Sequence, residues 1–174
     1  MAARAVLVTG ASRGIGAAVA RAFAASGDRV GVHYGSRGDA ALHVRDSLAG
    51  SGHVVAGADL ADPEAIRRMV DEVAGALGGI DVLVNNAGVF EPHAATQTSY
   101  EEWQAAWAHT LGVNLIGAAN VTWCVLRPLS PSSSAAAMSV DTNPGATAVT
   151  EIRRSPRARA SDCPNAISPA LLAP

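Results

Sequence analysis

The chain has 174 residues, of which 49% are hydrophobic, and a formal net charge of −2 at pH 7. This length suffices for one domain with a buried core, and the near-neutral charge excludes a broad basic surface for nucleic acid. The apolar run at the N-terminus is too short for a signal sequence or a membrane span, so we expect a cytoplasmic protein without membrane association.

Short apolar strands alternate with helical patterns through the first half of the chain. Strands are predicted at 5–10, 29–35, 53–60 and 80–88, and helices at 14–27, 38–52 and 62–79. In the first helix the apolar spacing predicts a face of Ile15, Val19 and Phe23. In the third, Asp62 is the predicted N-cap and Pro63 opens the helix. Its predicted apolar face is Ile66, Val70, Val73 and Leu77.

This alternation predicts an α/β fold of the Rossmann type, a doubly wound parallel sheet with helices on both faces. The strands are continuous apolar runs, as in a sheet buried on both sides. Right-handed crossovers place the fourth strand beside the first. We assign residues 1–128 to this domain and 129–174 to a separate tail.

A long helix is predicted over 99–126. Ser99 and Glu102 have the spacing of a capping box at its start. An apolar stripe on one face predicts packing into the core through Trp103, Trp107, Leu111, Leu115 and Ala118.

The composition changes from Leu129 onward, where Ser, Pro, Ala and Arg dominate. This predicts an irregular or disordered tail. Only 146–152 alternates enough for a strand, which could cover the apolar edge that 80–85 otherwise exposes. The Arg cluster at 153–161 is interpreted as solvated rather than as an RNA-binding site.

The basic residues are all Arg, and the chain contains no Lys. This excludes a Lys-containing phosphate loop and any Lys-dependent catalysis. Cys124 and Cys163 lack metal-ligand spacing, and we expect reduced thiols. Histidines without ligand spacing predict surface or half-buried side chains and no metal site: His33, His43, His53, His93 and His109.

The stretch "VTGASRGIG" places glycines at the turn between the first strand and the first helix. Glycine lets a pyrophosphate approach the backbone, and the N–H groups of a helix N-terminus bind it. The side chains of Ser12 and Arg13 add donors. The predicted phosphate-binding residues are Gly10, Ser12, Arg13, Gly14, Ile15 and Gly16.

With three further stretches, the chain resembles the short-chain dehydrogenase/reductase family, and within it the 3-oxoacyl-ACP reductase-like branch. Asp59 and Leu60 match the family's adenine contact after the third strand. Asn86, Ala87 and Gly88 belong to the "NNAG" motif that ends the fourth strand, and "VNLIGAANVT" contains the family's structural and catalytic asparagine, here Asn114. The resemblance covers about 5–127 and implies a nicotinamide dinucleotide, with hydride transfer to a small carbonyl or from an alcohol.

The cofactor preference follows from the residues after the second strand. An NAD site needs a carboxylate there for the ribose 2′-OH, and Tyr34, Gly35 and Ser36 supply none. Arg37 follows, and Arg13 lies in the glycine-rich turn, so a 2′-phosphate meets positive charge. NADP(H) is therefore favoured over NAD(H).

The family's catalytic groups are Tyr, a Lys four residues later, and Ser, beside the asparagine. The cation lowers the pKa of Tyr, which otherwise titrates near 10. The only tyrosines here are Tyr34 and Tyr100, neither followed by Lys, and no fifth strand ends in the expected serines. Asn114 is the only catalytic residue that we can assign.

The sequence therefore predicts an NADP(H)-dependent oxidoreductase of this family whose catalytic half is truncated or frameshifted after Arg127. We expect the catalytic activity of this chain to be impaired, because the Tyr, Lys and Ser of the family are missing. A non-catalytic NADP-binding or regulatory module remains the alternative, and an interaction protein acting through its tail is a third. We also expect a homo-oligomer that pairs through the long helix, as in the family.

Overall fold

A computed structural model describes residues 3–127, 137–141 and 148–153. These residues form one sheet of six strands in the order β3-β2-β1-β4-β6-β5. The strands are β1 (Ala5–Val8), β2 (Arg29–Tyr34), β3 (Val54–Gly57), β4 (Val82–Asn85), β5 (Ala137–Asp141) and β6 (Ala148–Arg153). The helices are α1 (Gly14–Ala25), α2 (Gly38–Asp46), α3 (Pro63–Leu77), α4 (Tyr100–Leu111), the π-helical η1 (Gly112–Gly117) and α5 (Ala118–Leu126).

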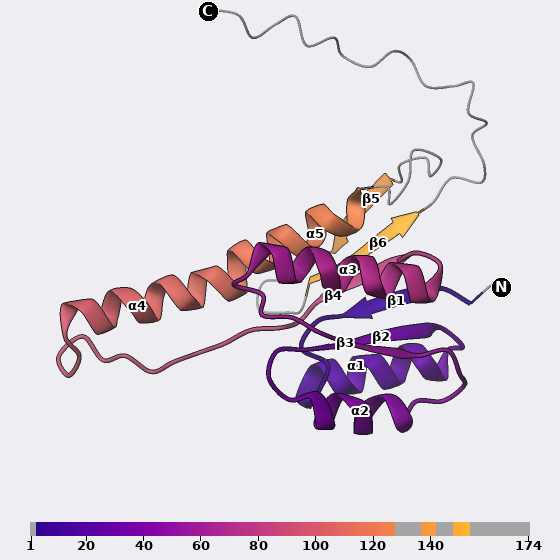
Figure 1. Cartoon of the computed structure of the whole chain (residues 1–174), viewed down its shortest axis with the longest axis horizontal. Coiled ribbons are helices and arrows are strands. Elements are labelled where there is room, and N and C mark those ends of the chain that lie inside the picture. The colour runs from indigo at the N-terminus through magenta and orange to yellow at the C-terminus, as the bar shows by residue number, and fades with distance from the viewer. Residues whose placement is uncertain (1–2, 128–136, 142–147, 154–174) are drawn as a thin grey trace, which may run out of the picture.

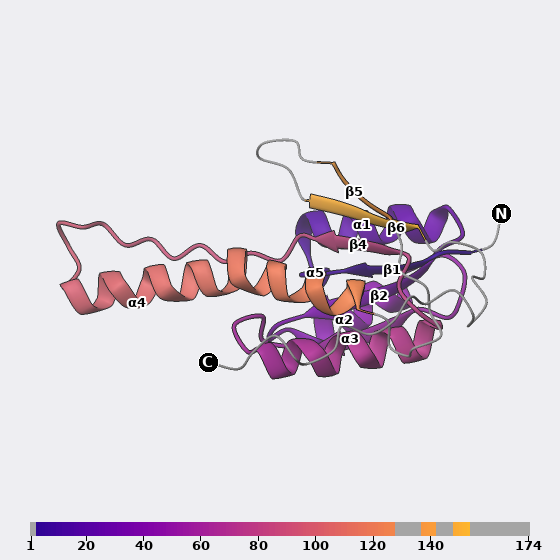
Figure 2. The same cartoon turned by 90° about the horizontal axis from the view of Figure 1, so that it is seen from above.

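The first four strands form the predicted doubly wound parallel sheet. β1 pairs in parallel with both β2 and β4, and β2 pairs with β3, which confirms that the fourth strand lies beside the first. Side chains alternate across β1: Leu7 packs with α3, whereas Val6 and Val8 pack with α1. Helices α1 and α2 cover one face of the sheet, and α3 and α5 cover the other (Figures 1 and 2).

An antiparallel hairpin extends the sheet beyond β4. β6 pairs with β4, and β5 pairs with β6. The predicted strand at 146–152 is confirmed at Ala148–Arg153, and it covers the β4 edge. The prediction of an irregular tail is wrong at Ala137–Asp141, which forms β5. The remaining tail predictions, with Cys163 and most of the Arg cluster, lie outside the described residues.

Helices α3 and α1 differ in how well their buried faces were predicted. The Asp62 side chain caps α3 by accepting from Glu64 N, and the predicted apolar face of α3 is buried. In α1 the prediction is wrong for Ile15, which is 69% exposed, whereas Val19 and Phe23 are partly buried and pack against the core. The buried residues are instead small: Gly16, Ala17, Ala20 and Ala24. At Gly16 a Cβ would lie 2.5 Å from Gly10 O, so the start of α1 lies too close to the turn after β1 for any side chain there.

The predicted long helix is present but is interrupted by η1, and its N-terminal half projects beyond the sheet (Figures 1 and 2). The Ser99–Glu102 capping box is confirmed. The predicted core stripe is wrong: α4 has no buried residue, and Trp107 and Leu115 are 41% and 60% exposed. Trp103 and Leu111 are exposed as well, and Ala118 is half-buried. No described layer covers this part of the helix.

None of the helices in the described part of the chain is long and apolar enough to cross a bilayer. The cytoplasmic location stays a prediction.

Candidate dinucleotide-binding cleft

A cleft of about 790 Å³ opens where the parallel strands end. Ligands of doubly wound sheets bind at this edge, where the strand order reverses, here between β1 and β4. All the residues assigned from the sequence to cofactor binding line it: Gly10, Ser12, Arg13, Gly14, Ile15, Gly16, Arg37, Asp59, Leu60, Asn86, Ala87 and Gly88. The structure thus brings together residues from four separate turns, while their cofactor role stays a prediction.

Two glycines make the floor of this cleft possible. Gly10 has φ of +64°, and a Cβ there would lie 2.7 Å from Ala87 Cα. A Cβ on Gly16 would lie 2.5 Å from Gly10 O and would overlap the Asn86 amide. Both positions therefore require glycine for a tight turn against the end of β4.

The N-terminus of α1 opens into the cleft without a side-chain cap. Arg13 at the N-cap forms no capping hydrogen bond, and the first turn of α1 contains no acidic residue. By contrast, Asp62 caps α3 and Ser99 caps α4. The first N–H groups of α1 are therefore available to an anion, and the helix dipole favours negative charge there.

Thr9 and Asn86 fasten the glycine-rich turn to the end of β4. Thr9 Oγ1 donates to Val84 O and accepts from Asn86 N and Ala87 N, both at 3.0 Å. The Asn86 amide donates to Thr9 O at 2.8 Å and to Gly10 O at 3.2 Å. These bonds make the two loops one rigid unit.

Asn114 is not among the residues that line the cleft, but its side chain binds Val89, which does line it. Its Oδ1 accepts from Val89 N at 2.8 Å, and its Nδ2 donates to Val89 O at 2.9 Å. Asn114 belongs to η1, and π-helical segments often occur at functional sites. Its side chain thus holds the segment after Gly88, and the catalytic role given by the family resemblance stays a prediction.

Neither tyrosine lies in the cleft. The ring of Tyr34 lies against Gly38 and Gly57, and Tyr100 is 68% exposed at the start of α4. β6 pairs with β4 in the antiparallel direction, and Ala148 at the amino end of β6 pairs with Asn85. The carboxyl end of β6 therefore lies at the end of the sheet away from the cleft. β6 therefore cannot deliver a serine from its carboxyl end into this cleft.

Sequence reasoning missed several lining residues: His33, Gly35, Ser36, Ala58, Val89, His109 and Val113. Four of them, His33, Gly35, Ser36 and Ala58, lie within two residues of the carboxyl end of a strand, and this position was the available signal. His33 is 2% exposed, so the prediction of a surface or half-buried side chain is wrong for it. His109 of α4 lines the cleft as well, and its Nδ1 lies 3.1 Å from Glu91 Oε1.

Comparisons with known proteins agree with this geometry. The sequence model of the short chain dehydrogenase family matches residues 4–153. The chain is 35% identical over 145 residues to a cis-4-hydroxycyclohexanecarboxylate dehydrogenase from Sinomonas cyclohexanicum, over 82% of this chain and 56% of that protein. It is 38% identical over 117 residues to a 3-oxoacyl-[acyl-carrier-protein] reductase from Synechocystis, over 66% of this chain and 46% of that protein.

Solved structures give the same result. A short chain dehydrogenase from Burkholderia cenocepacia, solved in complex with NADP, is 37% identical with a TM-score of 0.62, over 70% of this chain and 49% of that one. The chain thus spans about half the length of the relatives that it matches. The family match extends past Arg127 to the end of β6. On this match and on the shared fold, the chain belongs to the short chain dehydrogenase family.

Proposed function

We propose that the chain binds NADP(H) in the cleft at the carboxyl ends of β1, β2 and β4. The observation that best supports this is the uncapped N-terminus of α1 beside a glycine turn that leaves the backbone accessible. A pyrophosphate there accepts hydrogen bonds from the free N–H groups of α1. Asp59 and Leu60, which follow β3, are the proposed adenine contacts.

The preference for NADP(H) rests on charge. Arg13 and Arg37 line the cleft, and Asp59 is the only carboxylate among the described residues that line it. Asp59 Oδ1 accepts from Ala61 N at 2.8 Å, which ties that carboxylate to the turn after β3. Arginine binds a phosphate through charge-assisted hydrogen bonds. The Burkholderia cenocepacia relative, solved with NADP, supports the same preference.

The proposed activity of the whole protein is oxidoreduction of small carbonyl or alcohol compounds. The bound cofactor supplies or accepts the hydride. A neighbouring acid or base must exchange a proton with the substrate oxygen, and these 174 residues offer neither a Tyr in the described cleft nor any Lys. We therefore propose that the chain as given binds the cofactor without turnover. A non-catalytic NADP(H)-binding module is the second candidate, favoured by the same missing groups.

Calorimetric titration of the 174-residue chain with NADPH and NADH tests the binding. We expect NADPH to bind about tenfold more tightly, a difference of about 1.4 kcal/mol that one charge-assisted phosphate contact supplies. Arg37→Ala should remove most of this preference. Arg68→Ala, which removes an exposed arginine of α3, is the matched control. Gly16→Val should abolish binding of both nucleotides.

Failure of the wild-type chain to bind either nucleotide contradicts the proposed function. Turnover is tested separately, by NADPH oxidation with a panel of small ketones and aldehydes. Measurable turnover by the pure chain contradicts the proposed lack of catalysis and leaves the cofactor site standing. Binding without turnover supports both candidates, and the second candidate additionally requires that the chain fold stably alone.

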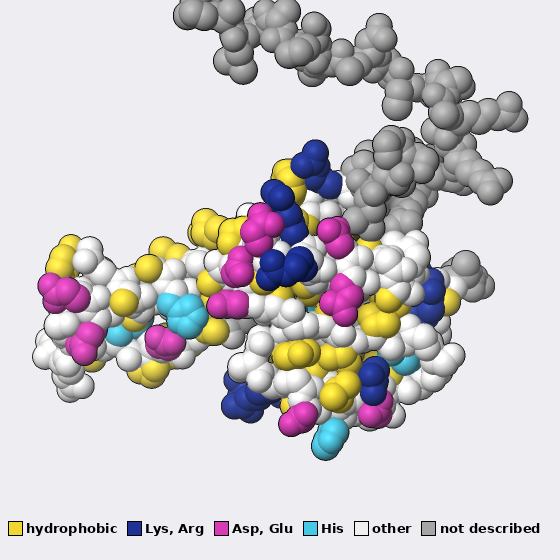
Figure 3. Space-filling view, viewed as in Figure 1, with side chains coloured by type: hydrophobic (Ala, Val, Ile, Leu, Met, Phe, Trp, Pro, Cys, Tyr) yellow, Lys and Arg dark blue, Asp and Glu magenta, His cyan; other side chains and the backbone are white. Residues whose placement is uncertain are grey.

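We also propose that two copies pair through the helix α4–η1–α5. Four exposed side chains recur every four residues along this helix and form one apolar stripe: Trp103, Trp107, Leu111 and Leu115. Figure 3 shows hydrophobic side chains along the projecting helix. Continuous exposed apolar surface marks interaction sites.

Sedimentation velocity tests this pairing. Trp107→Glu should convert a dimer into a monomer. Ala105→Glu adds the same charge to the same helix, about half a turn away from the stripe, and should leave the dimer intact. A wild-type chain that is monomeric at tens of micromolar would contradict the proposal.

A further inference from the structure

The buried ring of His33 makes two hydrogen bonds at the carboxyl end of β2, next to the cleft. His33 is the penultimate residue of β2 and 2% exposed. Its Nδ1 accepts from Gly10 N at 3.0 Å, and its Nε2 lies 3.1 Å from Ala58 O. Because a carbonyl oxygen only accepts, Nε2 must carry the proton and Nδ1 must be bare. The contacts therefore define a neutral imidazole in one tautomer.

The two partners belong to different walls of the cleft. Gly10 lies in the turn between β1 and α1, and Ala58 lies directly after β3. The backbone adds two bonds at the same place, from Ala11 N to His33 O at 2.8 Å and from Ala58 N to Tyr34 O at 3.0 Å. The end of β2 thus connects the glycine-rich turn to the segment after β3.

We propose that His33 is a positioning residue of the nucleotide site: its neutral ring holds the Gly10 turn against the Ala58 wall, and its protonation releases the turn and weakens nucleotide binding. A protonated ring has N–H groups on both nitrogens, so Nδ1–H would face the Gly10 N–H donor. This inference rests on the proposed function, and it assigns His33 no contact with the nucleotide itself.

The surroundings of the ring favour its neutral form. Burial lowers the pKa of His33 from its usual 6.5, and the Ala58 carbonyl opposes this only partly. Titratable and charged residues in the same cleft are Arg13, Arg37, Asp59 and His109, with Tyr34 next along the strand. Both ring hydrogen bonds go to backbone groups rather than to these side chains. Protonation therefore sets in only below the usual range.

The chain contains a matched control at the other end of the same strand. His53 Nδ1 accepts from Val30 N at 3.1 Å, and its Nε2 lies 3.0 Å from Ala49 O. This bridge is like that of His33, but it lies at the amino end of β2, away from the cleft. A substitution at His53 tests the structural loss of such a bridge without touching the site.

The experiment titrates the full 174-residue chain with ADP-ribose, which has no 2′-phosphate to titrate, at about pH 7.5 and about pH 4.5, because burial moves the pKa of His33 below its usual value. The wild-type affinity should fall several-fold on acidification. His33→Asn places an amide oxygen near the position of Nδ1 and cannot titrate, so its affinity should be independent of pH. His33→Phe fills the volume without an acceptor and should bind about tenfold more weakly at the higher pH. His53→Asn should behave as the wild type at both values.

The outcomes separate the two proposals. If both His33 variants bind as the wild type does, with the same pH dependence, the positioning role is overturned and the nucleotide site stands. If His53→Asn loses as much affinity as His33→Phe, the effect is a general loss of stability and the role is again overturned. If the wild-type chain binds neither ADP-ribose nor NADPH, the proposed function fails, and the role of His33 fails with it.

Discussion

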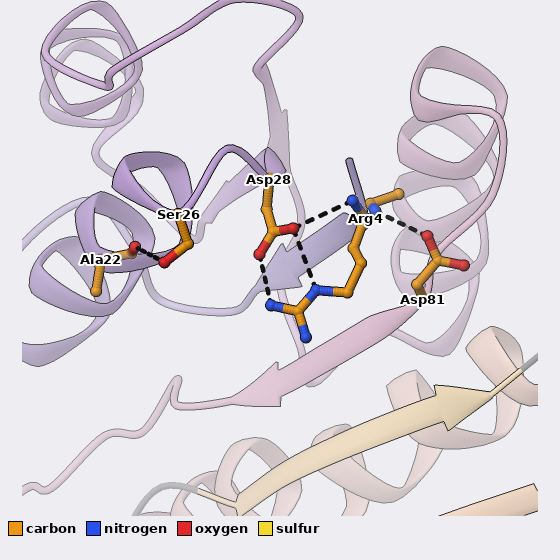
Figure 4. Close-up of polar contacts among 6 residues, drawn as sticks. Arg4, Ala22, Ser26, Asp28 and Asp81 are labelled. Carbon is orange, nitrogen blue, oxygen red and sulfur yellow. Dashed lines mark hydrogen bonds and ion pairs between the residues drawn. The ribbon is translucent and has the colours of Figure 1, made fainter. Parts of the chain in front are cut away.

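At the scale of single residues, Arg4 and Asp28 form the clearest ion pair of the described chain. Arg4 donates to Asp28 through Nη2 at 2.7 Å, through Nε at 3.1 Å and through its backbone N at 3.1 Å (Figure 4). Asp28 is 6% exposed, and Arg4 O in turn accepts from Arg29 N. The pair therefore joins the start of β1 to the start of β2.

Asp28→Asn should lower the free energy of unfolding at neutral pH by about 1–2 kcal/mol. This loss is smaller than for a fully buried ion pair, because the Arg4 side chain is 45% exposed and solvent screens the attraction. The Arg4 guanidinium holds the pKa of Asp28 below its usual 3.8. Because the pKa of Asp28 is lowered on folding, its ionised form stabilises the fold fully above pH 3.8. This stabilisation is lost as the pH falls through the lowered pKa of the folded state. Urea unfolding between about pH 7 and pH 3 should show the difference from wild type shrinking.

Asp46→Asn is the control, since Asp46 is 62% exposed in its pair with Arg45 and such pairs contribute little. Equal losses in the two variants, or a difference that grows in acid, would contradict the role of the Arg4–Asp28 pair.

At the scale of helices, α3 and α1 differ in whether a side chain caps the N-terminus. Asp62 completes the N-terminus of α3, where Pro63 opens the helix and Gly78 ends it with φ of +74°. α1 has no such cap and instead opens its N–H groups into the cleft. The missing cap on α1 is thus the local feature that fits an anionic ligand.

Asp62→Ala should destabilise the fold by about 1 kcal/mol, because the N–H of Glu64 loses its acceptor. Thermal unfolding followed by circular dichroism measures the change. Asp71→Ala removes a carboxylate from the exposed middle of the same helix and should have little effect. A larger loss for Asp71→Ala would rule out the capping argument.

At the scale of the whole molecule, the hairpin of β5 and β6 completes the sheet. β4 is an apolar strand, and its edge would be open to other chains without β6. Thr150 lies in the middle of β6, paired with Leu83 on one side and Val140 on the other. The hairpin therefore protects the sheet edge. Its outer strand β5 runs parallel to β4, but β6 lies between the two strands.

Thr150→Pro should detach β6 from β4, because proline removes a backbone donor from the middle of the sheet. We expect large aggregates that grow with concentration, measured by dynamic light scattering. Thr150→Val keeps the backbone donor and should stay dispersed. The protective role of β6 fails if the two variants scatter light alike.

The sequence predicted most of the first half of the fold because its signals are local. Apolar strand runs, the Asp62–Pro63 start of α3 and the Ser99–Glu102 box depend on neighbours in the chain, and the structure contains all of them. The stripe of Trp103 and Trp107 was placed wrongly in the core. Periodicity marks an apolar face but does not show whether another layer covers it.

The sequence by itself determined the doubly wound order of β1 to β4 and twelve of the residues that border the cleft, since chain order and strand-end turns fix both. Only the tertiary structure decided the antiparallel direction of β6, the exposure of α4 and the burial of His33. Each of these depends on contacts between segments far apart in the chain, such as His33 with Gly10 and Ala58, and no local pattern encodes such contacts.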